Sequence, residues 1–145
     1  MASSANDRLL EAAADGSLEG VEEALRQGAD IDARREFGDT ALNLAAEHGH
    51  KHVVQCLLDK GADIHNLGGA DKTPIMNAAF AGNIGIVRLL LEKGARVTDD
   101  LLASVQLKVG ILEENAELGM VRPEAVEAWK RFLDMLIAAR QAQGQ

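Results

Sequence analysis

A fixed period of 33 residues organises most of this 145-residue chain. The segment DTALNLAAEHGHKHVVQCLLDKGAD at 39–63 recurs as KTPIMNAAFAGNIGIVRLLLEKGAR at 72–96 and, more loosely, as NDRLLEAAADGSLEGVEEALRQGAD at 6–30. The glycines and alanine pairs keep one register in all copies: Gly16, Gly49 and Gly82; Gly28, Gly61 and Gly94; Ala12–Ala13, Ala45–Ala46 and Ala78–Ala79. Such self-similarity is typical of a stacked repeat protein, in which no single repeat buries its own apolar face.

The net charge of the chain narrows the classes of partner that it can bind. The chain has 15 basic and 23 acidic residues and a formal net charge of −8, whereas a nucleic-acid-binding surface is basic. We therefore expect no nucleic-acid partner. Residues 1–33 carry 8 acids and 2 bases, so most of the negative charge lies in the first repeat. A solvated end cap is the favoured interpretation, and a docking site for a basic partner is the alternative.

Cysteine content and hydropathy indicate the compartment. Cys56 is the only cysteine, which excludes an internal disulfide and fits a reducing environment. Glu23 and Leu89 occupy the equivalent positions of the neighbouring repeats, so a packed helix position is predicted rather than a reactive thiol. The first residues lack the pattern of a secretory signal, and no apolar run is long enough to cross a membrane. We expect a soluble, cytoplasmic protein that does not bind membranes.

Each repeat is predicted to contain two helices, at about 7–15 and 18–27 in the first copy, with a turn at Gly16. Asp7, Thr40 and Thr73 share a register position and are candidate helix caps. Finger segments at about 33–39 and 66–72 join successive pairs, with Gly38 and Gly68–Gly69 expected in their turns. The stacking columns are predicted to be Leu9, Leu42 and Ile75; Val21, Val54 and Val87; Leu25, Leu58 and Leu91; and Ile31, Ile64 and Val97.

The pattern changes after Gly94. Arg96 replaces the aspartate of the earlier copies, and the chain enters an apolar segment at 101–118 without another finger. We expect a helix there, capped by Asp99 or Asp100. Pro123 suits the first position of a second helix, on which Val126, Trp129, Leu133, Leu136 and Ile137 share one face.

The repeats resemble the ankyrin family. The matching elements are Thr40-Ala-Leu, Thr73-Pro-Ile, the alanine pairs, Gly49-His50 and Gly-Ala-Asp at 28–30 and 61–63. The resemblance covers about residues 5–100, with a weaker echo to about 140. It implies an all-α fold, an ankyrin-type α-solenoid of stacked helix-turn-helix repeats with short β-turn fingers. The expected single domain spans 1–145, with repeats at about 5–33, 34–66 and 67–98 and C-terminal cap helices at about 99–118 and 123–141.

The resemblance also implies non-catalytic protein–protein recognition on the concave surface of finger tips and first helices. Transferred position by position, the partner-binding residues are Arg34, Arg35, Glu36, Phe37, Asp39, Glu47, His48, Leu67, Gly69, Ala70, Lys72, Met76, Phe80 and Ala81. Phe37, Leu67 and Phe80 would form an apolar centre within a polar rim. Local packing of the two phenylalanines remains the alternative. Asn43 and Met76 stand where the family usually has histidine, so its threonine–histidine contact is not expected unchanged.

Two other functions remain open. An inhibitor or immunity protein would block a specific enzyme through the same surface. A metal-binding module would use His48, His50 and His52, but alternating positions across a helix junction are not expected to converge, and structural zinc takes about four ligands. No set of residues suggests acid–base or nucleophilic catalysis, so neither an enzyme nor a cofactor is predicted. The partner is expected to be an unidentified protein, and the chain a monomer.

Overall fold

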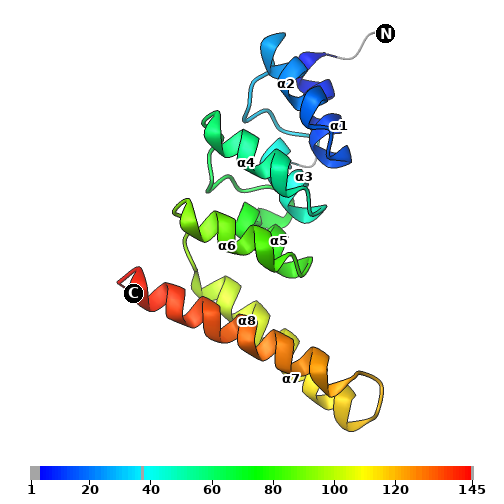
Figure 1. Cartoon of the computed structure of the whole chain (residues 1–145), viewed down its shortest axis with the longest axis vertical. Coiled ribbons are helices and arrows are strands. Elements are labelled where there is room, and N and C mark those ends of the chain that lie inside the picture. Colours follow the sequence, from blue (N-terminus) through cyan, green and yellow to red (C-terminus); the bar gives the residue numbers. More distant parts are fainter. Residues whose placement is uncertain (1–3, 37, 145) are drawn as a thin grey trace. The chain divides into compact units, whose positions relative to one another are not determined.

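The computed structural model describes residues 4–36 and 38–144, and the chain divides into two compact units between Ala95 and Arg96 (Figure 1). Regular structure in these residues is α-helical, apart from one short 3-10 turn, η1 (Gly69–Asp71), and an isolated antiparallel bridge between Arg34 and Thr40. The fold is therefore all-α, as the repeat pattern predicts.

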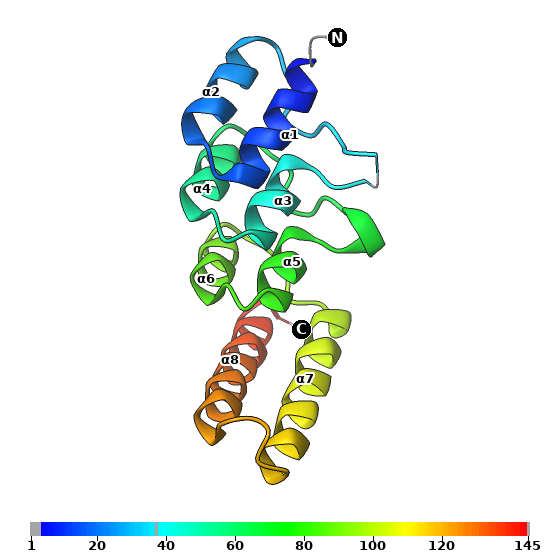
Figure 2. The ribbon, with the colours of Figure 1, turned by 90° about the vertical axis from the view of Figure 1, so that its right-hand side faces the viewer.

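The first unit consists of three helical pairs. They are α1 (Ala5–Asp15) with α2 (Leu18–Arg26), α3 (Ala41–Glu47) with α4 (Lys51–Asp59), and α5 (Pro74–Phe80) with α6 (Ile84–Glu92). Helices α1, α3 and α5 stack in one layer and α2, α4 and α6 in a second (Figure 2). The finger segments extend from the layer of first helices, away from the second layer (Figure 2).

The core of the first unit follows the 33-residue register. The leucine–isoleucine column and the valine column are buried as predicted: Leu9, Leu42 and Ile75; Val21, Val54 and Val87. The predicted column at Leu25, Leu58 and Leu91 is only half-buried. The buried residues there are instead Ala24, Leu57 and Leu90, one position earlier. One residue is a rotation of about 100° around a helix, so the period was right and the choice of face was wrong.

The helix starts show which polar residues act as caps. Ser4 caps α1 by accepting the N–H of Asp7 at 3.1 Å, so the prediction of Asp7 as the cap was wrong by three residues. Asp7 instead completes a capping box. Thr40 caps α3, whereas Thr73 finds no side-chain capping partner among the described residues. Proline at the first turn of α5 supplies a suitable φ instead.

The second unit is a pair of long helices, α7 (Asp99–Glu117) and α8 (Pro123–Ala142), which run side by side in opposite directions (Figure 2). Thr98 caps α7 by accepting the N–H of Leu101 at 3.2 Å, so neither Asp99 nor Asp100 is the cap. Asp99 instead pairs with Arg140 of α8. No helix in the described part of the chain is long and apolar enough to cross a membrane.

Candidate functional site

The two fingers of the first unit are closed by equivalent backbone hydrogen bonds. Arg35 donates its N–H to the carbonyl of Asp39 at 2.7 Å, and 33 residues later Gly68 donates to the carbonyl of Lys72 at 2.8 Å. Each finger is therefore a short turn closed by an equivalent hydrogen bond. The residues on either side of each turn therefore lie beside the layer formed by α1, α3 and α5.

The tip of the second finger has an unusual backbone. Ala70 has φ 58° and Asp71 has φ 55°, both in the left-handed region that L-residues avoid. In the first finger Gly38, with φ 95°, stands at the position of Asp71. Gly68 and Gly69 lie in this turn as predicted, but the left-handed residues are the two that follow them. The second finger is thus strained where the first uses glycine.

Arg34 and Asp39 join one finger to the next. The Arg34 guanidinium donates to the carbonyl of Gly38 at 2.9 Å and to the carbonyl of Leu67 in the second finger. Asp39 Oδ1 accepts the backbone N–H of Gly69 at 2.8 Å. Both residues were predicted to contact a partner. In the structure their hydrogen bonds hold the two fingers in register.

A buried polar network lies beneath the second finger. Asn43 Oδ1 accepts from the hydroxyl of Thr40 at 2.8 Å, and Asn43 Nδ2 donates to Asn77 Oδ1 at 2.8 Å and to the carbonyl of Lys72 at 3.2 Å. Asparagine therefore takes over the contact to threonine that histidine makes in the resembled family. Met76, at the same register position, has no polar group for this purpose and is half-buried.

Two predicted contact residues, Leu67 and Phe80, are apolar and exposed, and a third, Lys72, is half-buried. Leu67 is 50% exposed and Phe80 is 40% exposed. The Lys72 ammonium lies 5.3 Å from the centroid of the Phe80 ring, within cation–π range. Leu67 precedes Gly68, whose N–H donates to the carbonyl of Lys72, so Leu67 and Lys72 lie on the two sides of the same finger. We call Leu67, Lys72 and Phe80 the finger patch.

The other predicted residues differ in their exposure. Arg35, Glu36, Glu47, His48, Ala70 and Ala81 are exposed, and Gly69 is half-buried. Phe37 lies outside the described residues. Arg34, Arg35 and Glu36 also border a surface hollow with Asp7, Leu10 and Glu11 of α1. Sequence reasoning missed the α1 residues because it treated the first repeat as a solvated cap, although Leu10 is the register equivalent of Asn43.

The histidines do not gather. His50 Nε2 lies 2.8 Å from the carbonyl oxygen of Ala14, and the His48 ring centroid is 6.3 Å from that of His50. His52 borders a separate hollow between α2 and α4. Within residues 4–36 and 38–144, no group of three or more histidine, cysteine, aspartate or glutamate side chains could hold a metal ion. The geometry gives the metal-binding alternative no support.

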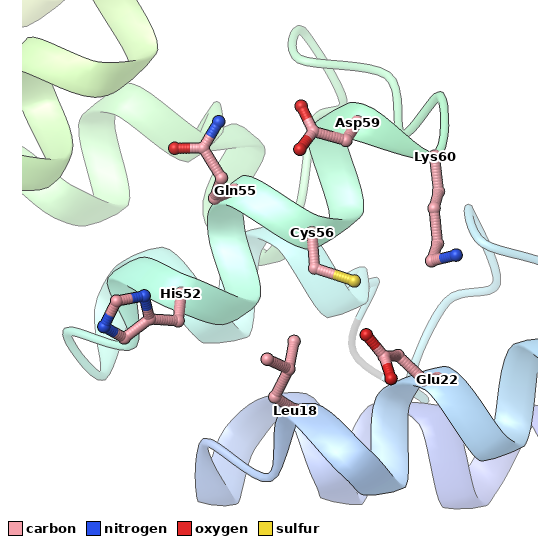
Figure 3. A pocket seen from close by; sticks show the side chains of 7 residues that line it. All are labelled: Leu18, Glu22, His52, Gln55, Cys56, Asp59 and Lys60. Atoms are coloured by element: carbon pink, nitrogen blue, oxygen red, sulfur yellow. The ribbon is translucent and has the colours of Figure 1, made fainter.

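A second hollow lies between α2 and α4, in the layer of second helices (Figure 3). It is bordered by Leu18, Glu22, His52, Gln55, Cys56, Asp59 and Lys60. The Cys56 thiol extends from α4 toward α2 (Figure 3). Partial burial raises the pKa of this thiol, against the opposing effect of Lys60. Cys56 therefore lacks the depressed pKa of a reactive cysteine.

The stacked helical pairs and turn fingers define a helical repeat protein. The model of the ankyrin repeat family matches residues 9–100 as three copies, and the chain belongs to this family. Two ankyrin repeat proteins of Rickettsia felis are each 45% identical to it over 49 residues, which are 34% of this chain and 78% and 74% of theirs. Ankyrin repeats are generally protein–protein interaction modules and typically non-catalytic.

Proposed function

We propose that this chain is a non-catalytic module that binds a partner protein through the fingers and first helices of its second and third repeats. The observation that carries the proposal is the finger patch. Leu67 and Phe80 expose apolar area on neighbouring elements, and Lys72 lies against the Phe80 ring. Exposed apolar residues grouped on one surface mark interaction sites, and aromatic residues are preferred anchors there.

Internal hydrogen bonds make this surface rigid before a partner arrives. Arg34 and Asp39 connect the two fingers, and Asn43 connects the second finger to α5 through Asn77. A surface that is already ordered loses less conformational entropy on binding. We therefore assign Arg34 and Asp39 a positioning role and Leu67 and Phe80 the principal contacts.

The rim of the patch carries both signs of charge. Arg35 is basic, Glu36 and Glu47 are acidic, and all three are exposed. A mixed rim favours a partner whose charges match in position rather than one of high net charge. We also propose a monomeric chain in the cytoplasm, where a reducing environment suits the single free thiol of Cys56.

The test is a pull-down from a lysate of the source organism with three matched baits. These are the native chain, Leu67→Ser/Phe80→Ser, and Leu18→Ser, whose side chain is 38% exposed but lies in the layer of second helices. A partner retained by the native chain and by Leu18→Ser, but lost with the double variant, is the expected result. Thermal unfolding of all three baits checks that their folds are equally stable.

Equal retention by the native chain and the double variant would contradict the proposal, because the contact would then lie elsewhere. Once a partner is identified, calorimetric titration gives a quantitative test. Loss of both apolar contacts should weaken its affinity by about tenfold or more, since a buried leucine or phenylalanine contributes about 1.5–3 kcal/mol.

A further inference from the structure

Helix α7 carries apolar side chains on two opposite faces. Leu101, Val105 and Val109 are buried on one of them. On the other, Leu107 and Ile111 are 67% and 47% exposed, and Leu118 and Met120, just beyond the helix, are 73% and 72% exposed. A helix on a protein surface ordinarily has one apolar stripe, facing the core. We call Leu107, Ile111, Leu118 and Met120 the α7 stripe.

The partner helix α8 does not cover this stripe. The Lys108 ammonium lies 5.7 Å from the ring centroid of Trp129, and Glu113 pairs with Lys130 at 2.8 Å. At about 100° per residue, these two α7 positions flank the buried face, and the stripe lies on the far side of the helix from α8. Within the second unit, the stripe is a helix face without a partner.

Negative charge accompanies the stripe. Residues 97–121 contain five acids and only one base, Lys108. Glu114 falls within the stripe by helical register and Glu117 at its border. Neither makes an ion pair with any described residue, whereas Glu113 is matched by Lys130. The surface therefore combines apolar contact area with unmatched carboxylates.

We propose that the α7 stripe docks an amphipathic helix from a partner protein, with one apolar face flanked by lysine or arginine. Contacts at i, i+4 and i+11 match the spacing at which one helix packs along another. From Leu107 to Leu118 the stripe extends about 16 Å, or three turns, at 1.5 Å per residue. The flanking bases would pair with Glu114 and Glu117.

The same charges disfavour two other occupants. A second copy would bring one acidic stripe against another, and like charges across an interface oppose association. An anionic membrane surface would repel these carboxylates in the same way. The stripe belongs to the second unit, so this proposal does not depend on the finger patch or on the function proposed above.

The test uses the full chain and two fluorescent synthetic peptides of about five helical turns. Both carry the same leucine stripe, flanked by lysine in one and by glutamate in the other. We expect the basic peptide to bind at least about tenfold more tightly by anisotropy, and Leu107→Ser/Ile111→Ser to weaken its binding by about tenfold or more. Leu67→Ser/Phe80→Ser, which leaves α7 intact, should bind like the native chain.

A second variant tests the contribution of the carboxylates without changing the apolar side chains. Glu114→Gln/Glu117→Gln should weaken the basic peptide and reduce the dependence of its affinity on salt. Equal affinity for the two peptides, or unchanged binding and salt dependence in this variant, would overturn the proposal. So would self-association of the native chain in sedimentation velocity that Leu107→Ser/Ile111→Ser abolishes, because the occupant would then be a second copy.

Discussion

The side-chain amide of Asn43 donates a hydrogen bond of 2.8 Å to the side-chain oxygen of Asn77, joining the first helices of two neighbouring repeats. Both residues are buried, and the same Asn43 side chain also holds Thr40 and the carbonyl of Lys72. One asparagine thus connects a helix start, the next finger and the next helix.

We expect Asn43→Ala to lower the free energy of unfolding by about 3 kcal/mol. The change leaves the oxygen of Asn77 and the carbonyl of Lys72 without this donor, and each unsatisfied buried group costs about 1–3 kcal/mol. Urea denaturation measures the effect. The double variant Asn43→Ala/Asn77→Ala should lose clearly less than the sum of the single losses, since the residues share a bond. Additive losses would show that the bond contributes little.

A comparison of alanine substitutions at Gly16 and Gly61 separates the cost of a steric clash from the cost of backbone strain. A Cβ at this position would lie 2.5 Å from Nδ1 of His50, and the φ of 79° disfavours any L-residue. Gly61 has φ 95° but open space around the same position. We expect Gly61→Ala to cost about 1–2 kcal/mol from strain alone, and Gly16→Ala at least about 1 kcal/mol more from the clash. Equal thermal destabilisation of the two variants would show that the His50 ring moves away freely.

Ala70→Gly should stabilise the protein. Relief of a left-handed alanine returns about 1–2 kcal/mol, and the added freedom of the unfolded chain removes about 0.4–1 kcal/mol, leaving a gain of up to about 1.5 kcal/mol. Ala81, also exposed, has an ordinary φ of −82°. Ala81→Gly should therefore be destabilising by the entropic amount alone. Chemical denaturation in which both variants lose stability would contradict the strained finger.

The thiol of Cys56 should make the free energy of unfolding decrease at alkaline pH. Burial raises its pKa in the folded state, so the folded chain holds the thiol proton more tightly than the unfolded chain. This contribution is complete below the unfolded pKa, about 8.5, and is lost as pH rises through the higher folded pKa. Relative to Cys56→Ala, the native chain should lose stability progressively as the pH rises above about 8.5, as measured by urea denaturation midpoints. Parallel pH profiles of the two proteins would refute the assignment.

The helical pairs could be predicted because their signal is repeated. Gly28, Gly61 and Gly94 follow their helices with φ of 93°, 95° and 97°, as the register requires. Details that depend on a single side chain were harder to predict from the sequence. Ser4 rather than Asp7 caps α1, since either residue can accept a backbone N–H and only the local φ and ψ decide between them.

The exposure of the candidate contact residues was predictable from the sequence, but their hydrogen bonds were not. The register placed Leu67 and Phe80 in solvent, and both are exposed. It placed Arg34 and Asp39 beside them as contact residues, but their hydrogen bonds run to the next finger. Those partners lie 33 and 30 residues away, about one repeat, but the repeat pattern does not determine whether a side chain bonds to the next finger or extends into solvent. The prediction for Phe37 lies outside the described residues and stays a prediction.

The sequence by itself determined the period, the helical class and the family, because apolar and glycine positions that recur every 33 residues leave stacking as the only way to bury them. The tertiary structure decided which face each helix buries, how Asn43 replaces a histidine, and that α7 keeps an apolar stripe in solvent. These features depend on rotation about a helix axis and on contacts between distant residues. Small differences in packing geometry determine both the rotation of each helix and these distant contacts.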